Sequence, residues 1–116
     1  MSVYSVIREA GPGFLDGGIP AQPDVADHAE FMNALASEGM VLFAGPLAGT
    51  ETGRLRALLI MSADGEDEIR HRLDDDPWVR TDRLVITSIE PWNVIVGAER
   101  LAISGNPLPA GPGEPA

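Results

Sequence analysis

The order of two kinds of apolar segment constrains the fold of this chain more than any other feature. Four short segments are rich in residues that favour β-strands, and they cover residues 3–8, 40–44, 55–61 and 83–89. Two longer segments, residues 24–39 and 63–75, place apolar side chains at helical spacing. The chain therefore reads strand, helix, strand, strand, helix, strand.

This order predicts an α+β fold of the ferredoxin-like type, the βαββαβ plait. Its four strands form one antiparallel sheet, in which residues 40–44 and 55–61 pair as a hairpin, and both helices pack on one face. Residues 92–96 can extend the last strand past Pro91. The second face of such a sheet needs a cover, which a second copy of the chain commonly provides.

The length and composition fit one small domain that gains stability by association. A chain of 116 residues buries a modest core, and aromatic residues make up only 5% of it. Small domains with few large side chains often associate, so we expect a homodimer. We expect one domain over residues 1–97, followed by a tail, residues 98–116, that is partly disordered because residues 106–116 are rich in Pro and Gly.

The charge of the chain argues against nucleic acid as a partner. The formal net charge is −10, whereas affinity for nucleic acid depends on basic side chains that neutralise phosphates. No apolar run has the length of a membrane-spanning helix, and the first residues lack the basic start and apolar stretch of a signal peptide. We therefore expect a cytoplasmic protein with neither a membrane nor a nucleic acid as its partner.

Two missing residue types exclude several kinds of chemistry. The chain has no cysteine, which excludes disulfides and thiolate nucleophiles, and all eight basic residues are arginine, which excludes a Schiff base on lysine. No spacing of His28, His71 and the acidic residues suggests a metal site. Gly11-Pro12-Gly13 lacks the third glycine of a dinucleotide-binding loop. We expect neither a metal nor a cofactor.

His28 is the strongest candidate for chemistry. In the predicted helix over residues 24–39 it shares one face with three apolar residues at i+3, i+4 and i+7: Phe31, Met32 and Leu35. A buried imidazole needs a hydrogen-bond partner, and we choose Asp76, the last of three successive aspartates, because Pro77 constrains its backbone. A carboxylate on one ring nitrogen fixes the tautomer and leaves the other nitrogen free to accept a proton.

Each candidate residue also has a purely structural interpretation. His28 can be a core histidine whose ring binds a backbone carbonyl, and Asp76 can simply end the second helix. Gly45 and Pro46 can bring the backbone close to a ligand, or they can just terminate a strand. Trp78 can wall a cleft, or it can pin the second helix to the sheet.

Four segments together indicate a family. They are His28-Ala29-Glu30-Phe31-Met32, the ten residues 38–47, Asp76-Pro77-Trp78-Val79 and Ile89-Glu90-Pro91-Trp92. In this order, and on these predicted elements, they resemble the YciI-like (YCII-related) family. The likeness covers roughly residues 3–97.

The resemblance implies a dimeric α/β barrel, in which two ferredoxin-like sheets pack face to face beside a cleft that holds a His–Asp pair. His28 matches the histidine of the family and Asp76 its aspartate, while Gly45 and Pro46 match the Gly-Pro pair beside the cleft. A few relatives act as lyases, dehydrochlorinases or isomerases on ring-cleavage or chlorinated aromatic intermediates. The chain departs from the family pattern in residues 11–23, a loop that can be a lid or a plain surface excursion.

The residues leave three hypotheses about function open. The first is a lyase- or isomerase-type enzyme without a cofactor, in which His28 moves a proton on a small cyclic or aromatic-derived metabolite. Asp76 would orient His28, and Gly45, Pro46 and Trp78 would contact the substrate. The second is a module that binds a small molecule without turnover. The third is a structural dimer in which His28 is a satisfied core residue.

Overall fold

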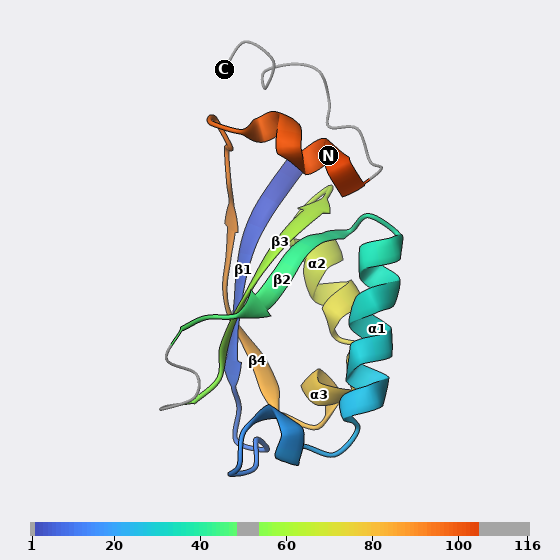
Figure 1. Cartoon of the computed structure of the whole chain (residues 1–116), viewed down its shortest axis with the longest axis vertical. Coiled ribbons are helices and arrows are strands. Elements are labelled where there is room, and N and C mark those ends of the chain that lie inside the picture. Colours follow the sequence, from blue (N-terminus) through green and yellow to red (C-terminus); the bar gives the residue numbers. More distant parts are fainter. Residues whose placement is uncertain (1, 49–53, 105–116) are drawn as a thin grey trace.

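One antiparallel sheet of four strands organises the protein. The computed structural model describes residues 2–48 and 54–104. The strands lie side by side in the order β2-β3-β1-β4 (Figure 1) and are β1 (Ser2–Ala10), β2 (Val41–Pro46), β3 (Arg56–Ala63) and β4 (Leu84–Pro91). Helices α1 (Val25–Ser37) and α2 (Glu66–Leu73) lie on one face of this sheet. The predicted α+β ferredoxin-like fold is confirmed.

The core lies between the sheet and the helices. Successive side chains of β1 alternate between its two faces, so Tyr4 and Val6 are buried against the helices while Ser5 and Ile7 are only partly covered. The largest buried aliphatic side chains of this core come from α1, α2 and β3: Leu35, Leu59, Met61, Ile69 and Leu73. Of the residues that helical spacing placed inward, Leu35, Ile69 and Leu73 are buried, whereas Phe31 and Met32 are partly buried.

The second predicted helix, residues 63–75, is shorter than expected and is followed by another. Ala63 still belongs to β3, where it pairs with Ser2, and α2 ends at Leu73. A four-residue helix, α3 (Pro77–Arg80), then begins directly after Asp76. The Asp-Pro pair starts a helix because proline favours the first helical position and the residue before it is held in an extended conformation.

The loop over residues 11–23 is built around one buried side chain. Gln22 is 4% exposed, and its amide nitrogen donates to the carbonyls of Leu15 and Gly18, both at 2.7 Å. Its amide oxygen accepts from the backbone N–H of Leu15 at 2.8 Å. A short 3-10 helix, η1 (Ile19–Ala21), lies inside this loop. The segment therefore has an internal framework, which Gly and Pro content alone did not predict.

The sequence predicted that residues 92–96 extend the last strand, and this prediction is wrong. The backbone N–H of Trp92 donates to the carbonyl of Val3 at 2.8 Å, but β4 ends at Pro91 and residues 92–96 belong to none of the strands that the structure describes. The chain continues into a 3-10 helix, η2 (Ala98–Ser104). Residues 106–116, which we predicted to be disordered, lie outside the described residues, and the domain end at residue 97 stays a prediction.

The other face of the sheet carries no α-helix in the described part of the chain (Figure 1). Ile60 alternates with the core residues of β3 and points to this face, where its partner on β2, Phe43, is 54% exposed. Ile7 and Leu58 pair on the same face and are partly exposed. We call these four residues the open face.

No helix within residues 2–48 and 54–104 is long and apolar enough to cross a membrane.

Candidate active site

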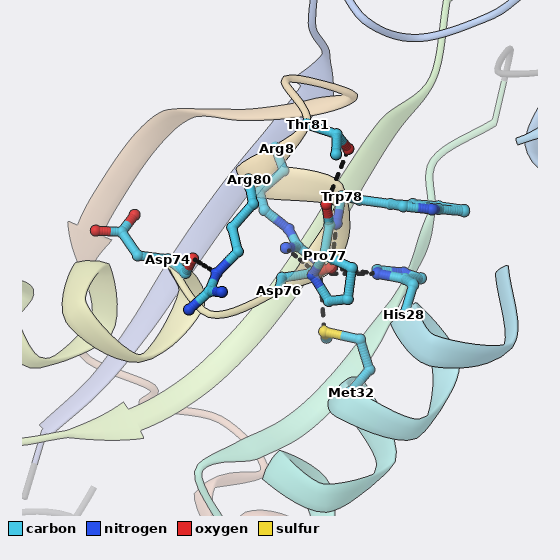
Figure 2. Close-up of polar contacts among 9 residues, drawn as sticks. All are labelled: Arg8, His28, Met32, Asp74, Asp76, Pro77, Trp78, Arg80 and Thr81. Carbon is cyan, nitrogen blue, oxygen red and sulfur yellow. Dashed lines mark hydrogen bonds and ion pairs between the residues drawn. The ribbon is translucent and has the colours of Figure 1, made fainter. Parts of the chain in front are cut away.

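Asp76 lies at the N-terminus of α3 and is completely buried. Its Oδ1 accepts a hydrogen bond from the backbone N–H of Trp78 at 2.9 Å, which makes Asp76 the N-cap of α3. The interpretation of Asp76 as the end of the second helix is thus wrong, because α2 has already ended at Leu73. The cap turns the carboxylate inward, toward α1 and β1 (Figure 2).

His28 reaches Asp76 from α1 (Figure 2). Its Nδ1 lies 2.9 Å from both carboxylate oxygens of Asp76. The imidazole also stacks on the indole of Trp78, with ring centroids 3.9 Å apart and an angle of 5° between the planes. Both contacts of the imidazole therefore come from the Asp76-Pro77-Trp78 motif, and neither is the backbone carbonyl of the structural alternative. The catalytic role of the pair stays a prediction.

Arg8 is the third member of the site, and it was absent from the sequence-based prediction. It is 2% exposed, and its Nη1 donates to Oδ2 of Asp76 at 2.9 Å. Its Nη2 lies 3.4 Å from the sulfur of Met32. A signal was available, because Arg8 alternates with Tyr4 and Val6 on the inward face of β1. An arginine at such a position requires a buried anion.

Arg8, His28 and Asp76 together determine the charge of the site. Burial alone would raise the pKa of Asp76, because it disfavours the charged form. The hydrogen bonds from His28 and from the Trp78 N–H, together with the charge of Arg8, outweigh burial and hold the pKa of Asp76 below its ordinary value. Burial lowers the pKa of Arg8 while Asp76 opposes that shift, and a guanidinium stays charged at neutral pH.

This arrangement fixes the tautomer of neutral His28. An ionised carboxylate only accepts hydrogen bonds, so Nδ1 of His28 must carry the proton that it shares with Asp76. Nε2 then holds a lone pair, and it has no hydrogen-bond partner among the residues that the structure describes. A neutral imidazole in this state can accept a proton at Nε2 and later return it.

A cavity of about 300 Å³ lies against His28. The imidazole is 18% exposed and forms part of the cavity wall. The lining is mostly apolar and comes from the sheet, α1, α3 and the loop before α1: Arg8, Ile19, Val25, His28, Ala29, Met32, Ala44, Gly45, Pro46, Leu55, Ala57, Leu59, Trp78 and Leu84. Among these lining residues, Arg8 and His28 are therefore the ones with ionisable side chains.

The other predicted contact residues also line this cavity. Gly45 and Pro46 lie at the end of β2, and a Cβ added to Gly45 would meet no atom within 4 Å. The fold itself therefore does not require glycine there, and its role in ligand approach stays a prediction. Trp78 lines the cavity. It does not pin the second helix to the sheet, because it belongs to α3, where it is 2% exposed and its indole N–H donates to the backbone carbonyl of Pro23 at 2.9 Å. Its contact with a substrate stays a prediction.

The remaining candidates lie elsewhere. Trp92 is 46% exposed and does not line the cavity, and His71 is exposed on α2. Within the described ranges, no three side chains of His, Asp or Glu converge in a way that could hold a metal ion. The site is therefore described by one histidine, one carboxylate and one guanidinium.

Removal of the Asp76 carboxylate will destabilise the fold strongly. In Asp76→Ala, the charge of Arg8 stays buried without its partner and α3 loses its cap, so we expect a loss of about 3–5 kcal/mol in urea unfolding. Asp75→Ala is the matched control, because Asp75 is 59% exposed and pairs with an exposed Arg80. That variant will lose less than about 1 kcal/mol. Equal losses in the two variants would contradict the proposed burial of charge.

The stability of the protein will depend on Asp76 in acid. Because the pKa of Asp76 is lowered in the folded chain, the unfolded chain takes up a proton first as the pH falls below about 4. The free energy of unfolding will therefore decrease through that range and until the pH has passed the folded pKa. Urea unfolding between pH 7 and acid will show a shallower decrease in Asp76→Asn. Identical slopes in the two proteins would rule out a lowered pKa at Asp76.

Comparisons with known proteins agree with this fold. None of the curated proteins compared with the chain matches it. Among solved structures, the chain is similar to 5-chloro-2-hydroxyhydroquinone dehydrochlorinase from Burkholderia phenoliruptrix AC1100 in complex with 2,5-dihydroxybenzoquinone, with 23% identity and a TM-score of 0.59 over 78% of this chain and 93% of that chain. This likeness shows a shared fold. A family model for the YCII-related domain matches residues 3–93, and the chain therefore belongs to the YCII-related family.

Proposed function

We propose that the chain is an enzyme of the lyase or isomerase type that uses His28 to move a proton and needs no cofactor. One observation carries the proposal: Asp76 holds Nδ1 of His28, while the same imidazole forms part of the wall of the cavity. A base held in one tautomer beside a cavity is what general acid–base catalysis requires. Asp76 acts here as a positioning residue.

The chemistry follows from the free lone pair on Nε2 of His28. Nε2 takes a proton from an acidic C–H or O–H of the substrate and becomes an imidazolium, which Asp76 stabilises. In an isomerisation, the imidazolium returns that proton to another atom of the same molecule. In an elimination, the electron pair of the broken C–H bond forms a double bond while a leaving group departs with its own pair. The proton then passes from His28 to solvent.

The cavity supports a small cyclic or aromatic-derived metabolite as the substrate. Its volume of about 300 Å³ and its mostly apolar lining fit one small ring. Trp78, Gly45 and Pro46 line the same space. The structural neighbour, a dehydrochlorinase in complex with a quinone, supports this class of substrate by analogy.

A binding module without turnover is the alternative, and one observation favours it. The Arg8–Asp76–His28 network links β1, α3 and α1 through buried contacts, so it can serve the fold alone. Such a protein would bind a ring in the cavity and release it unchanged. The two readings differ in what the loss of His28 does to the chemistry of a bound compound.

Proton exchange will separate these readings. We expect the protein to exchange acidic C–H positions of some small cyclic ketones or phenols in D₂O, detected by NMR across a panel of such compounds. His28→Gln will slow this exchange by about 100-fold or more, the usual contribution of a general base. His71→Gln will not, because His71 lies exposed on α2. Exchange that survives unchanged in His28→Gln, or equal effects of the two substitutions, would reject His28 as the base.

We also propose that the chain forms a homodimer through the open face. Phe43 is 54% exposed there, and partly exposed aliphatic side chains continue this apolar surface across the neighbouring strands. Exposed apolar patches of this kind commonly mark interfaces. Two copies that pack these faces together would form the α/β barrel expected of the family.

Light scattering will test the dimer. The wild type will have twice the mass of the 12.3 kDa chain, whereas Phe43→Asp will be a monomer because the carboxylate cannot be buried in an apolar interface. Leu15→Asp is the control, since Leu15 is 48% exposed on the loop before α1. A wild-type monomer, or a Phe43→Asp dimer of unchanged affinity, would contradict this interface.

A further inference from the structure

Arg8 has hydrogen-bonding capacity that the protein does not use. Of its three nitrogens, only Nη1 meets a strong acceptor, Asp76. Nη2 faces the sulfur of Met32 at 3.4 Å, and a thioether is a weak acceptor. Nε is buried and has no partner. Arg8 nevertheless forms part of the wall of the cavity beside His28.

The negative charge near Arg8 is shared with other donors. Oδ2 of Asp76 accepts from Arg8 and lies equally close to Nδ1 of His28, and Oδ1 binds the N–H of Trp78. No carboxylate is among the described residues that line the cavity, and Asp76 itself lies behind Arg8 and His28. A buried guanidinium whose one anionic partner is divided in this way remains an attractive site for a second anion.

We propose that Arg8 forms the oxyanion subsite of the cavity and that the ligand is a planar ring with an ionised hydroxyl, a phenolate or an enolate. The ligand oxygen accepts from the guanidinium in place of the sulfur of Met32, which is a poor competitor for the same N–H. The mostly apolar cavity of about 300 Å³ fits the ring, and the guanidinium of Arg8 in its wall fits the charged oxygen. This inference rests on the proposed function for its chemistry but makes its own prediction about binding.

The subsite explains why the guanidinium and the imidazole share one carboxylate. Asp76 holds both groups at hydrogen-bond distance, so it places the proton acceptor and the cationic donor on the same wall. When His28 removes a proton from a hydroxylated ring, negative charge develops on the ring oxygen. A preorganised donor at that oxygen stabilises the charge as it forms.

The ionisation of bound 4-nitrophenol tests the subsite without any turnover. This probe is a planar ring whose hydroxyl ionises near neutral pH, and only its phenolate absorbs strongly in the visible range. We expect the wild type to bind the phenolate roughly tenfold more tightly than the phenol, as an opposite charge at close range would require. Absorbance titration in pH steps, with protein in excess, measures that ratio directly. Absence of binding, or equal affinity for the two forms, would overturn the proposal.

A comparison of two variants that differ only at Arg8 tests whether this residue causes the preference for phenolate over phenol. Asp76→Asn keeps an oxygen that can cap α3 but removes the competing negative charge, so its preference for phenolate will increase. The double variant Arg8→Met, Asp76→Asn removes both buried charges together, which protects the fold better than removal of Arg8 alone, and its preference will disappear. Circular dichroism will check that both variants are folded. A preference that persists in the double variant would contradict the role of Arg8.

His28→Gln separates this proposal from the proposed function. If Arg8 is the source of the preference, phenolate will still bind more tightly than phenol in this variant. Loss of the preference in His28→Gln would instead assign it to the imidazole and reject the Arg8 subsite. A retained preference together with unchanged proton exchange would leave the subsite intact and reject only catalysis by His28.

Discussion

The buried carboxylate of Asp76 is the interaction on which the rest of this structure depends. It caps α3 through the N–H of Trp78, pairs with the guanidinium of Arg8 and holds the imidazole of His28, each at 2.9 Å. These contacts join three elements that are far apart in the sequence. A lone buried carboxylate would be costly, but three donors compensate for the loss of water. The same contacts that satisfy the carboxylate also orient Arg8 and His28 in the cavity wall, so the stability of the fold and the proposed chemistry depend on the same side chain.

The short motif around Asp76 explains how so small a domain builds a defined site. Proline after Asp76 fixes an extended backbone, the cap starts α3, and the helix brings the Trp78 indole under the imidazole at 3.9 Å. The loop before α1 is held by Gln22 and contributes Ile19 to the cavity wall. The hydrogen bond to Asp76 and the stacked indole of Trp78 leave the imidazole little freedom to turn, which is the preorganisation that acid–base chemistry needs.

Much of the fold could be predicted from the sequence, because the periodicity of its apolar residues is strong in each long element. Periodicity also singled out His28, a polar residue on an apolar helix face. Asp76 was chosen for a different reason, because the proline that follows it constrains its backbone. Arg8 was missed, although its place in the alternation of β1 puts it inside. The start of α3 and the Gln22 framework depend on side chains that bind backbone groups, and periodicity carries no information about such contacts.

We infer that Asp76 holds neutral His28 with its proton on Nδ1 and its lone pair on Nε2. Long-range ¹H–¹⁵N correlation spectra of the two imidazoles measure this directly, with exposed His71 as the internal reference. We predict that neutral His28 shows the Nδ1–H tautomer in the wild type and loses it in Asp76→Asn, whose amide can also donate. A neutral His28 with its proton on Nε2, or a tautomer that ignores the substitution at Asp76, would contradict this account.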